Sequence, residues 1–255
     1  MYWLEQAEAD VPAENDWLSA SEAARLNAMR FAKRRADWRL GRWTAKRAVA
    51  AYLDVPGHSQ ALANIEIRPA ASGAPEVFVL KTAAPATISL SHRDGTALCA
   101  VAPSGTALGC DLELIETRSD GFVADYFTAE EQALVARVSS EDRPRLLALL
   151  WSAKESALKA LHEGLRLDTR SLTVSPIEAL RSQNQNKDES LDDPALSFPQ
   201  DRDNVWHPLQ VCCTDGQVFH GWWQQTGPLL RTLVAAPPPF PPIPLIIKSA
   251  NQTLT

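Results

Sequence analysis

One short segment constrains the fold of this 255-residue chain more than any other: the apolar run 107–115 carries two carboxylates two residues apart. Successive side chains of a β-strand point to opposite faces. In a strand, Asp111 and Glu113 would share one face, and the leucines and cysteine that alternate with them would occupy the other. Gly109 lacks a side chain and can let a ligand approach the backbone. The segment predicts a sheet with one buried face and two neighbouring oxygen donors on the other.

A second segment, 151–159, places Glu155 between Lys154 and Lys159 on a predicted helix over 144–163. Alone, neither segment is specific. Asp-x-Glu is common on solvated strand faces, and Glu155 with Lys159 is an i,i+4 surface pair worth ~0.3–0.5 kcal/mol. Together, three carboxylates with lysines beside them suit a hard divalent cation that is bound with a phosphate ester.

The remaining pattern alternates between helices and strands. Helices are predicted over 19–54, with a cap at Ser19 or Ser21, and over 128–138, where Thr128 and Glu131 have capping-box spacing. Short strands are predicted within 62–82 and at 88–92, 97–102, 171–175, 208–213 and 217–223. Arg93-Asp94-Gly95 predicts a hairpin turn, and the polar stretch 181–203 predicts a long loop. This order is compatible with two similar α+β halves divided near 103–108, although no internal sequence repeat is visible.

The end of the chain is rich in proline, with six prolines among the eight residues 237–244. Proline fixes φ and removes a backbone donor. We therefore expect no regular structure there, only a flexible extension or a surface strap. A chain that ends near Ala236 should keep its activity.

Composition narrows the class of protein. Apolar residues make up 45% of the chain, enough for a sizeable core, and the net charge of −6 argues against nucleic acid as a partner. Four cysteines without metal-finger spacing indicate reduced thiols. The first residues resemble no signal peptide, and no apolar run approaches the ~18 residues that span a bilayer. We expect a soluble, cytoplasmic monomer that has no membrane partner.

Positive charge gathers on an early helix. Arg35, Arg39, Arg42 and Lys46 follow i, i+4, i+7 and i+11 and share one face. Such a face suits a polyphosphate ligand, and it equally suits a solvated surface that balances acids elsewhere. His92, at the end of a predicted strand, can donate to a phosphate, but a lone histidine there is more often structural.

Several strings occur in an order that matches a family. They are R-R-x-x-x-x-L-G-R (34–42), S-H (91–92), G-x-D-x-E (109–113), F-x-x-x-E (127–131) and W-x-x-K-E-S-x-x-K (151–159). On these strings the chain resembles, from about residue 30 to 175, the 4'-phosphopantetheinyl transferases of the larger, surfactin-synthetase-activating type. The resemblance implies an α+β pseudo-dimer of two similar halves, with coenzyme A in the cleft between them. The halves would be residues 1–106 and 107–235, followed by a proline-rich tail over 236–255.

The resemblance also implies roles for particular residues. Asp111, Glu113 and Glu155 would hold Mg²⁺, with Mn²⁺ as a possible substitute, on the pyrophosphate of coenzyme A. The phosphates would be bound by Arg42, Lys46, Ser91, His92, Lys154 and Lys159. Lys159 would neutralise charge on the leaving group, and Glu155 or Glu131 would accept a proton from the attacking hydroxyl. Two positions depart from the family: Ala74 stands where a lysine often binds phosphate, and Arg42 stands where some members have an acid.

The implied reaction moves 4'-phosphopantetheine from coenzyme A to a serine hydroxyl of an acyl or peptidyl carrier protein and releases adenosine 3',5'-bisphosphate. The carrier could belong to fatty-acid, polyketide or non-ribosomal peptide synthesis. One alternative is a catalytically silent module that binds coenzyme A or a carrier protein. Another is an unrelated Mg²⁺ phosphoesterase, which would need an activated water. The intact carboxylate trio argues against the silent module, and the lack of a further metal-ligand string argues against the phosphoesterase.

Overall fold

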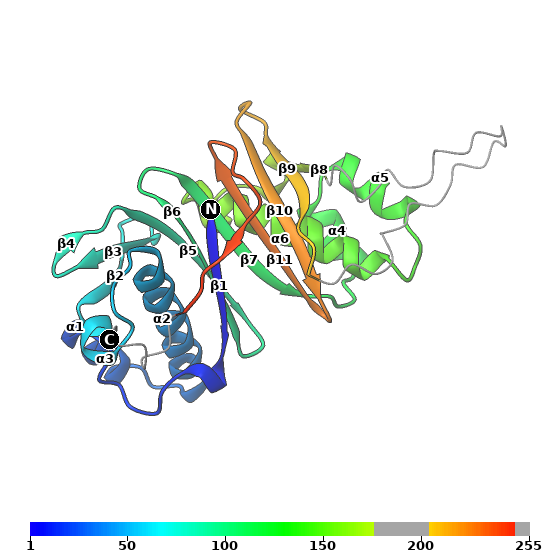
Figure 1. The fold of residues 1–255 in the computed structure, drawn as a ribbon. Coiled ribbons are helices and arrows are strands. Elements are labelled where there is room, and N and C mark those ends of the chain that lie inside the picture. The colour runs from blue at the N-terminus through cyan, green and yellow to red at the C-terminus, as the bar shows by residue number, and fades with distance from the viewer. Residues whose placement is uncertain (176–203, 248–255) are drawn as a thin grey trace.

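The computed structural model describes residues 1–175 and 204–247, so the loop predicted over 181–203 lies outside the described residues. Helices and strands are mixed along the chain, and the strands form several sheets (Figure 1). The predicted α+β class is confirmed. In the described ranges, no helix has the length and apolar character needed to cross a membrane.

The N-terminal half runs from β1 to β6. Its long helix α2 packs against a sheet made of β1, β6 and β5, and the hairpin β2–β3 lies beside β5. The elements are β1 (Tyr2–Ala7), the 3-10 turn η1 (Glu8–Asp10), α1 (Ala20–Asn27), α2 (Ala32–Tyr52), α3 (Ser59–Ala63), β2 (Ile65–Pro69), β3 (Pro75–Val79), β4 (Thr82–Ala83), β5 (Ala86–Arg93) and β6 (Thr96–Pro103).

The C-terminal half runs from β7 to β11, and its long helix α6 lies across the sheet β7-β11-β10-β9-β8. The elements are β7 (Ala107–Leu114), α4 (Asp120–Tyr126), α5 (Ala129–Arg137), α6 (Arg143–Ala160), the 3-10 turns η2 (Gly164–Arg166) and η3 (Thr169–Ser171), β8 (Leu172–Ser175), β9 (His207–Cys213), β10 (Val218–Thr226) and β11 (Leu229–Ala236). Sequence patterns missed α4, β11 and the N-terminal strand β1.

The two halves share one strand order. In each half the first strand pairs antiparallel with the last strand, and the last strand pairs with the one before it: β1-β6-β5 corresponds to β7-β11-β10. A long helix (α2 or α6) stands between the first strand and a later two-strand pair, β2–β3 or β8–β9, which are antiparallel. This correspondence of connections exists although no sequence repeat marks it.

Local sequence explains several boundaries. Ser19 caps α1 and exchanges hydrogen bonds with Glu22, and Thr128 caps α5 and does the same with Glu131. Both are capping boxes, which satisfy the free N–H groups of the first helical turn. The predicted turn at the tip of β5–β6 has positive φ at Asp94 (48°) and Gly95 (70°), as a two-residue hairpin with the twist of its strands requires.

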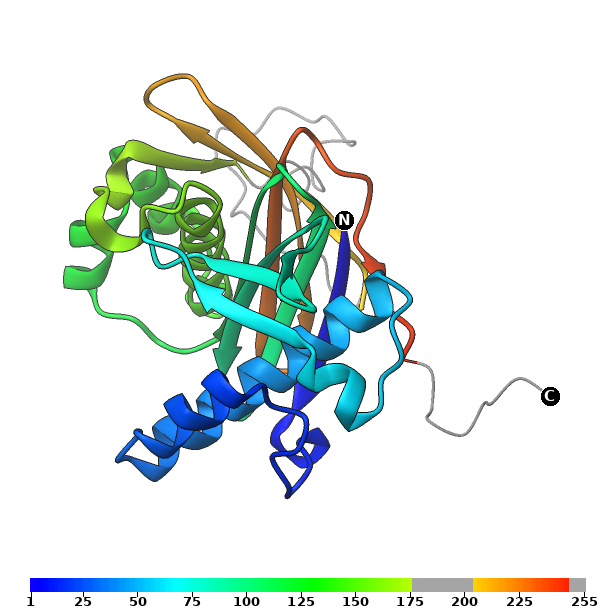
Figure 2. The ribbon, with the colours of Figure 1, turned by 90° about the vertical axis from the view of Figure 1, so that its left-hand side faces the viewer.

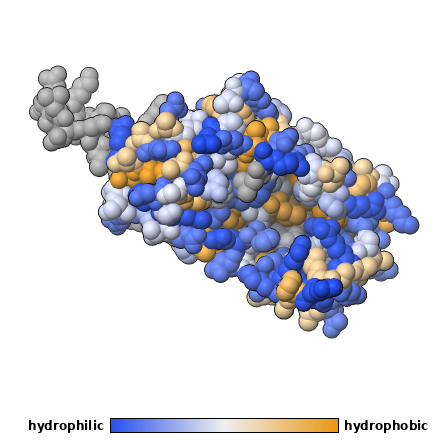
Figure 3. Space-filling model, turned by 180° about the vertical axis from the view of Figure 1, so that it is seen from behind, coloured by the Kyte–Doolittle hydropathy of each residue, from blue (hydrophilic) through white to orange (hydrophobic). Residues whose placement is uncertain are grey.

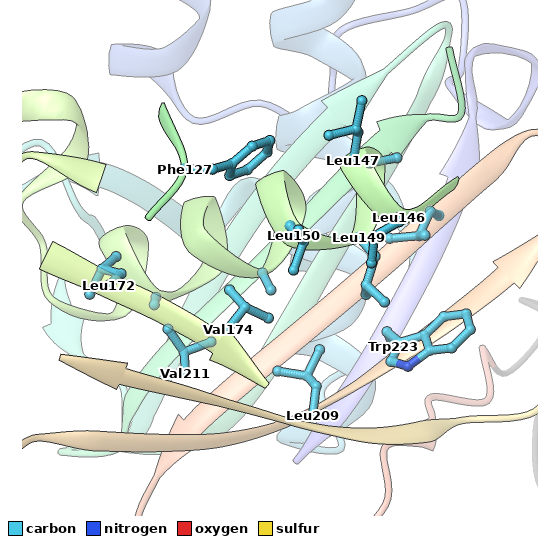
Figure 4. Packing of buried hydrophobic residues seen from close by; sticks show 14 of the residues in the cluster. Phe127, Leu146, Leu147, Leu149, Leu150, Leu172, Val174, Leu209, Val211 and Trp223 are labelled. Carbon is cyan, nitrogen blue, oxygen red and sulfur yellow. The ribbon is translucent and has the colours of Figure 1, made fainter. Parts of the chain in front are cut away.

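Apolar side chains form a core in each half and a third cluster between the halves. In the C-terminal half, leucines of α6 pack over β8, β9 and β10 (Figure 4), and each fully buried leucine contributes about 1.5–3 kcal/mol. The cluster between the halves joins the apolar face of β7, as predicted, to β6 and β11, and consists of Leu98, Ala100, Ala102, Leu108, Cys110, Leu112, Leu233 and Ala235. The face opposite to that of Figure 1 mixes hydrophilic and hydrophobic residues (Figure 3).

The proline-rich tail differs from the expectation that it adds to no sheet. A two-residue strand, β12 (Ile243–Pro244), pairs parallel with β1, so the red end of the chain lies beside the blue N-terminal strand (Figures 1 and 2). Ile243 N–H donates to Met1 O at 3.1 Å, and Leu245 N–H donates to Trp3 O at 2.8 Å. Pro244 falls between these two donors, where the edge strand requires no N–H. Leu245 and Ile247 then pack against the N-terminal core.

Candidate active site between the two halves

A cavity of about 430 Å³ lies where the C-terminal end of α6 meets β5 and the β2–β3 hairpin. Its wall comes from both halves of the chain. The polar and charged residues that line it are Arg25, Arg42, Arg68, Ser72, Ser89, Lys159 and His162. The cavity thus presents several positive charges in a protein whose net charge is negative.

The carboxylates of β7 are held beneath α6. Asp111 and Glu113 are 5% and 9% exposed, so the alternative interpretation of this face as a solvated surface does not hold. The close approach of the helix depends on Gly109, because a Cβ there would lie 1.7 Å from the backbone oxygen of Ser156. The expectation that Gly109 admits a ligand is therefore wrong: the space is filled by the backbone of α6.

Asp111 is the junction of three elements. Lys159 of α6 donates to Asp111 Oδ1 at 2.7 Å and to Cys110 O at 3.0 Å. Ser91 of β5 donates to the same carboxylate oxygen at 2.9 Å. Asp111 Oδ2 is buried and has no hydrogen-bond partner. A negatively charged oxygen left without a partner in a buried place is costly unless a cation or donor binds there.

Glu113 is held by a different set of neighbours. Trp151 Nε1 donates to Glu113 Oε1 at 3.1 Å, and Arg118 contacts Oε2 at 3.3 Å. Arg93 lies 3.8 Å from the same oxygen. Burial and the charge of Asp111 raise the pKa of Glu113, against the opposing effect of the two arginines. The two arginines thus offset part of the cost of burying this carboxylate beside Asp111.

Glu155 faces the same group from α6. Burial, followed by the negative charge of Asp111, raises the pKa of Glu155 above its ordinary value. Burial lowers the pKa of Lys159, but the neighbouring negative charges, first that of Asp111, outweigh it and the pKa is raised. The charges of Asp111 and Glu155 thus gather beside the ammonium group of Lys159, whereas Glu113 is matched by two arginines.

The donor set suits a hard divalent cation. Its donors are carboxylate oxygens, one of which, Asp111 Oδ2, is buried and unpaired. Among the residues that the structure describes, no group of three or more His, Cys, Asp or Glu side chains is gathered closely enough to hold a metal by itself. Mg²⁺ does not require such a cage, because it is commonly held by one or two carboxylates together with water and substrate phosphate. The arrangement is compatible with an ion that binds together with its phosphate ligand.

The early basic helix is used mainly for folding. Arg35 donates to Leu26 O at 3.0 Å, and Arg39 donates to Ala13 O at 3.1 Å. Both arginines thus hold the segments that precede α2, and neither is among the residues that line the cavity. Arg42 does line the cavity and lies 3.8 Å from Glu22.

Three predicted site residues lie in the interior instead. Lys46 and Lys154 are both 0% exposed, and Glu131 is 2% exposed. Lys46 pairs with Glu22 at 2.5 Å, and Lys154 pairs with Glu131 at 2.7 Å. These placements correct the expectation that the two lysines contact phosphate and that Glu131 can accept the proton of the attacking hydroxyl. Their charges are already matched inside the fold.

The β-hairpin residues show what the sequence patterns missed. Ser91 reaches Asp111, whereas His92, the next residue on β5, is exposed and is not among the residues that line the cavity. Arg25 and Arg68 line the cavity but belong to no recognised sequence motif, since only the fold brings α1 and β2 together there. Gly73, Ala74 and Pro75 lie in the wall of the cavity. Ala74 replaces the lysine that often binds phosphate in the family, and Arg68 supplies a positive charge to the same wall.

Comparison with known proteins agrees with this geometry. Residues 107–209 match the sequence model of a family described as the 4'-phosphopantetheinyl transferase superfamily. The match covers about two fifths of the chain and includes β7 and α6, with Asp111, Glu113, Glu155 and Lys159. No curated protein matches the chain. The similarity to this superfamily that the motifs indicated is therefore confirmed for the C-terminal half.

Proposed function

We propose that this protein transfers the 4'-phosphopantetheine group of coenzyme A to a serine hydroxyl of an acyl or peptidyl carrier protein. The observation that carries the proposal is the junction at Asp111, where Lys159 and Ser91 meet one carboxylate at the edge of a basic cavity. Asp111 and Lys159 of this junction lie in the region that matches the transferase superfamily. The larger, surfactin-synthetase-activating type is favoured because both halves of one chain line the cavity.

The cavity suits the phosphates of coenzyme A. Arg25, Arg42 and Arg68 enter it from the N-terminal half, and Lys159 enters from the C-terminal half. Guanidinium groups bind phosphate through two parallel hydrogen bonds, which fixes orientation as well as charge. In the proposed complex the three arginines hold the nucleotide phosphates, and Lys159 faces the pyrophosphate.

Asp111 and Glu155, with Glu113 beside them, would hold Mg²⁺ against the pyrophosphate. When bound there, the ion would supply positive charge that neutralises the phosphate oxygens and aligns them for displacement. Lys159 donates to Asp111 and keeps that carboxylate oriented. As the bond to the leaving phosphate breaks, the same ammonium group can stabilise the charge that develops on the bridging oxygen.

Glu155 is the proposed proton acceptor. Its pKa is raised by burial and by the charge of Asp111, and a carboxylate whose pKa moves toward neutrality is a better base at physiological pH. Glu131 is not a candidate, because both its oxygens are engaged with Lys154 and with backbone N–H groups. The serine hydroxyl of the carrier would lose its proton to Glu155 as its oxygen attacks the β-phosphorus of coenzyme A.

The test is to incubate the protein with coenzyme A, Mg²⁺ and apo carrier proteins of the three biosynthetic classes. The mass of each carrier protein is then measured by mass spectrometry. A gain equal to one phosphopantetheine group, lost when the carrier serine is changed to alanine, supports the proposal. Coenzyme A binding without any mass gain would favour the silent module. Breakdown of coenzyme A without modification of any carrier would favour the phosphoesterase.

A further inference from the structure

Within the part of the chain that the structure describes, each half of the molecule contains one buried glutamate–lysine pair. The N-terminal pair is Glu22 of α1 and Lys46 of α2, which are 3% and 0% exposed and 2.5 Å apart. The C-terminal pair is Glu131 of α5 and Lys154 of α6, which are 2% and 0% exposed and 2.7 Å apart. Buried charges are rare unless they are paired, so two such pairs in equivalent places call for an explanation.

The glutamates of the two pairs make the same contacts. Each is the third residue of a short helix and accepts a hydrogen bond from the backbone of the capping residue: Ser19 at 3.0 Å for Glu22, and Thr128 at 2.9 Å for Glu131. The other oxygen of each accepts a hydrogen bond from the backbone of a strand in the same half. The donors are Ile67 N–H of β2 at 3.1 Å and Val174 N–H of β8 at 2.9 Å.

The lysines also match. Lys46 donates to Trp17 O at 2.9 Å and Leu62 O at 3.1 Å. Lys154 donates to Thr169 O at 2.9 Å, Leu172 O at 2.8 Å and Tyr126 O at 3.2 Å. An ammonium group has three donors, so each lysine is saturated by fixed oxygens. Each pair therefore ties a long helix to a short helix, to a strand and to the chain between them.

The two ties hold different groups toward the cavity. Lys154 precedes Glu155 directly and lies five residues before Lys159, so its tie fixes the rotation of α6 where that helix meets Asp111. Lys46 lies one helical turn after Arg42, which lines the cavity and stands 3.8 Å from Glu22. One tie thus acts on the acidic site, and the other acts on a basic wall of the cavity.

We infer that the two pairs are positioning pairs with divided roles in the proposed reaction: the C-terminal pair sets the catalytic carboxylate and lysine of α6, and the N-terminal pair sets the arginine wall that binds coenzyme A. This inference rests on the proposed function. It gives a positioning role to the four charged residues of the two pairs, which touch neither substrate nor ion. It also explains why motif residues Lys154 and Glu131 are buried.

The experiment compares two matched double variants, Glu131→Gln with Lys154→Met and Glu22→Gln with Lys46→Met. Each removes one buried pair without leaving a single charge, so both should lower Tm to a similar extent. The C-terminal variant should lose kcat on the order of tenfold to a hundredfold with little change in KM for coenzyme A. The N-terminal variant should raise that KM on the order of tenfold and keep kcat within about twofold. Equal losses of both parameters in the two variants would overturn the inference.

Milder variants guard against unfolding. Glu131→Asp and Glu22→Asp keep a negative charge beside each lysine and shorten only the reach of the carboxylate to its backbone donors, and they should show the same division at smaller size. A second readout is direct binding. The affinity for coenzyme A, measured by calorimetry without metal, should fall only in the N-terminal variant. The affinity for Mn²⁺ in the presence of coenzyme A, measured by electron paramagnetic resonance, should fall only in the C-terminal variant. The opposite pattern would overturn the inference. A wild-type protein that modifies no carrier would overturn the proposed function itself, whereas an active wild type with indistinguishable variants would overturn only the division of roles.

Discussion

Replacing Gly109 by alanine should separate the strand and the helix that build the site. A Cβ at this position would lie 1.7 Å from the backbone oxygen of Ser156 and 2.7 Å from its carbonyl carbon. Ordinary contact begins near 3.4 Å, so α6 would have to move from β7 by roughly 1.5 Å. Overpacking typically costs ~1–3 kcal/mol. Because backbone atoms oppose the new methyl group and cannot rotate away, we expect Gly109→Ala to lose about 3 kcal/mol of unfolding free energy or more.

Gly41 provides a matched control with the opposite sign. It lies inside α2, and a Cβ there would meet no atom within 4 Å. Glycine inside a helix costs roughly 0.5–1 kcal/mol relative to alanine, so Gly41→Ala should stabilise the protein by about that amount. Urea unfolding of the two variants and the wild type, compared through the midpoint at unchanged m, measures both effects.

The activity of Gly109→Ala should fall further than its stability alone explains. A helix displaced from β7 carries Glu155 and Lys159 away from Asp111, and a misplacement of about 1 Å can cost on the order of 10²-fold in rate. The rate should be measured at a temperature where the variant is fully folded. A Gly109→Ala variant that unfolds at the wild-type urea midpoint would refute the close packing of α6 on β7.

Four further outcomes are expected. Asp111→Ala should abolish transfer, and also the rise in Tm that Mg²⁺ and coenzyme A give the wild type, because the ion loses a ligand; full activity would contradict the metal assignment. Lys159→Ala should lower kcat more than it raises KM for coenzyme A, since charge on the leaving phosphate grows in the transition state. A raised KM at constant kcat would show instead that Lys159 binds the substrate and the transition state equally well. Burial and the charge of Asp111 raise the pKa of Glu155, so ionisation of this group destabilises the folded state. At a pH above the pKa of Glu155 in the folded protein, Glu155→Gln should therefore raise Tm. Thermal scans should show that this gain vanishes when the pH falls below the ordinary pKa of 4.5, where both side chains are neutral. A chain that ends at Ala236 loses the β12 pairing and the packing of residues 245–247, and should unfold about 2–4 kcal/mol more easily; an unchanged urea midpoint would show that the strap adds no stability.

Features set by neighbouring residues could be predicted from the sequence. The capping box at Thr128 and Glu131, the cap at Ser19 and the hairpin turn at Asp94-Gly95 formed as expected, because four or fewer residues fix their geometry. The alternation on β7 also gave the correct buried face. The alternation did not predict that the other face is buried as well, since the burial of Asp111 depends on α6, a helix more than thirty residues away.

Elements that depend on distant partners escaped the sequence patterns. β11 pairs with β7 across more than a hundred residues, and β1 pairs with both β6 and the end of the chain. The tail misled for a related reason. Proline composition argues against a strand in general, but Pro244 occupies the single position of β12 whose N–H is not needed, between the donors at Ile243 and Leu245. Only the register of pairing could reveal this.

The two lysines of the 151–159 string show how far helical geometry alone can go. At about 100° per residue, Lys154 and Lys159 are separated by roughly 140° around α6, whereas Glu155 and Lys159 differ by only about 40°. One face therefore cannot serve both lysines. Lys159 shares the face of Glu155 and reaches Asp111, and Lys154 must turn elsewhere, which in this fold is the interior and Glu131. The geometry of the helix separates the two lysines, but only the packing of α5 and β8 shows that the second one has a buried partner rather than a phosphate.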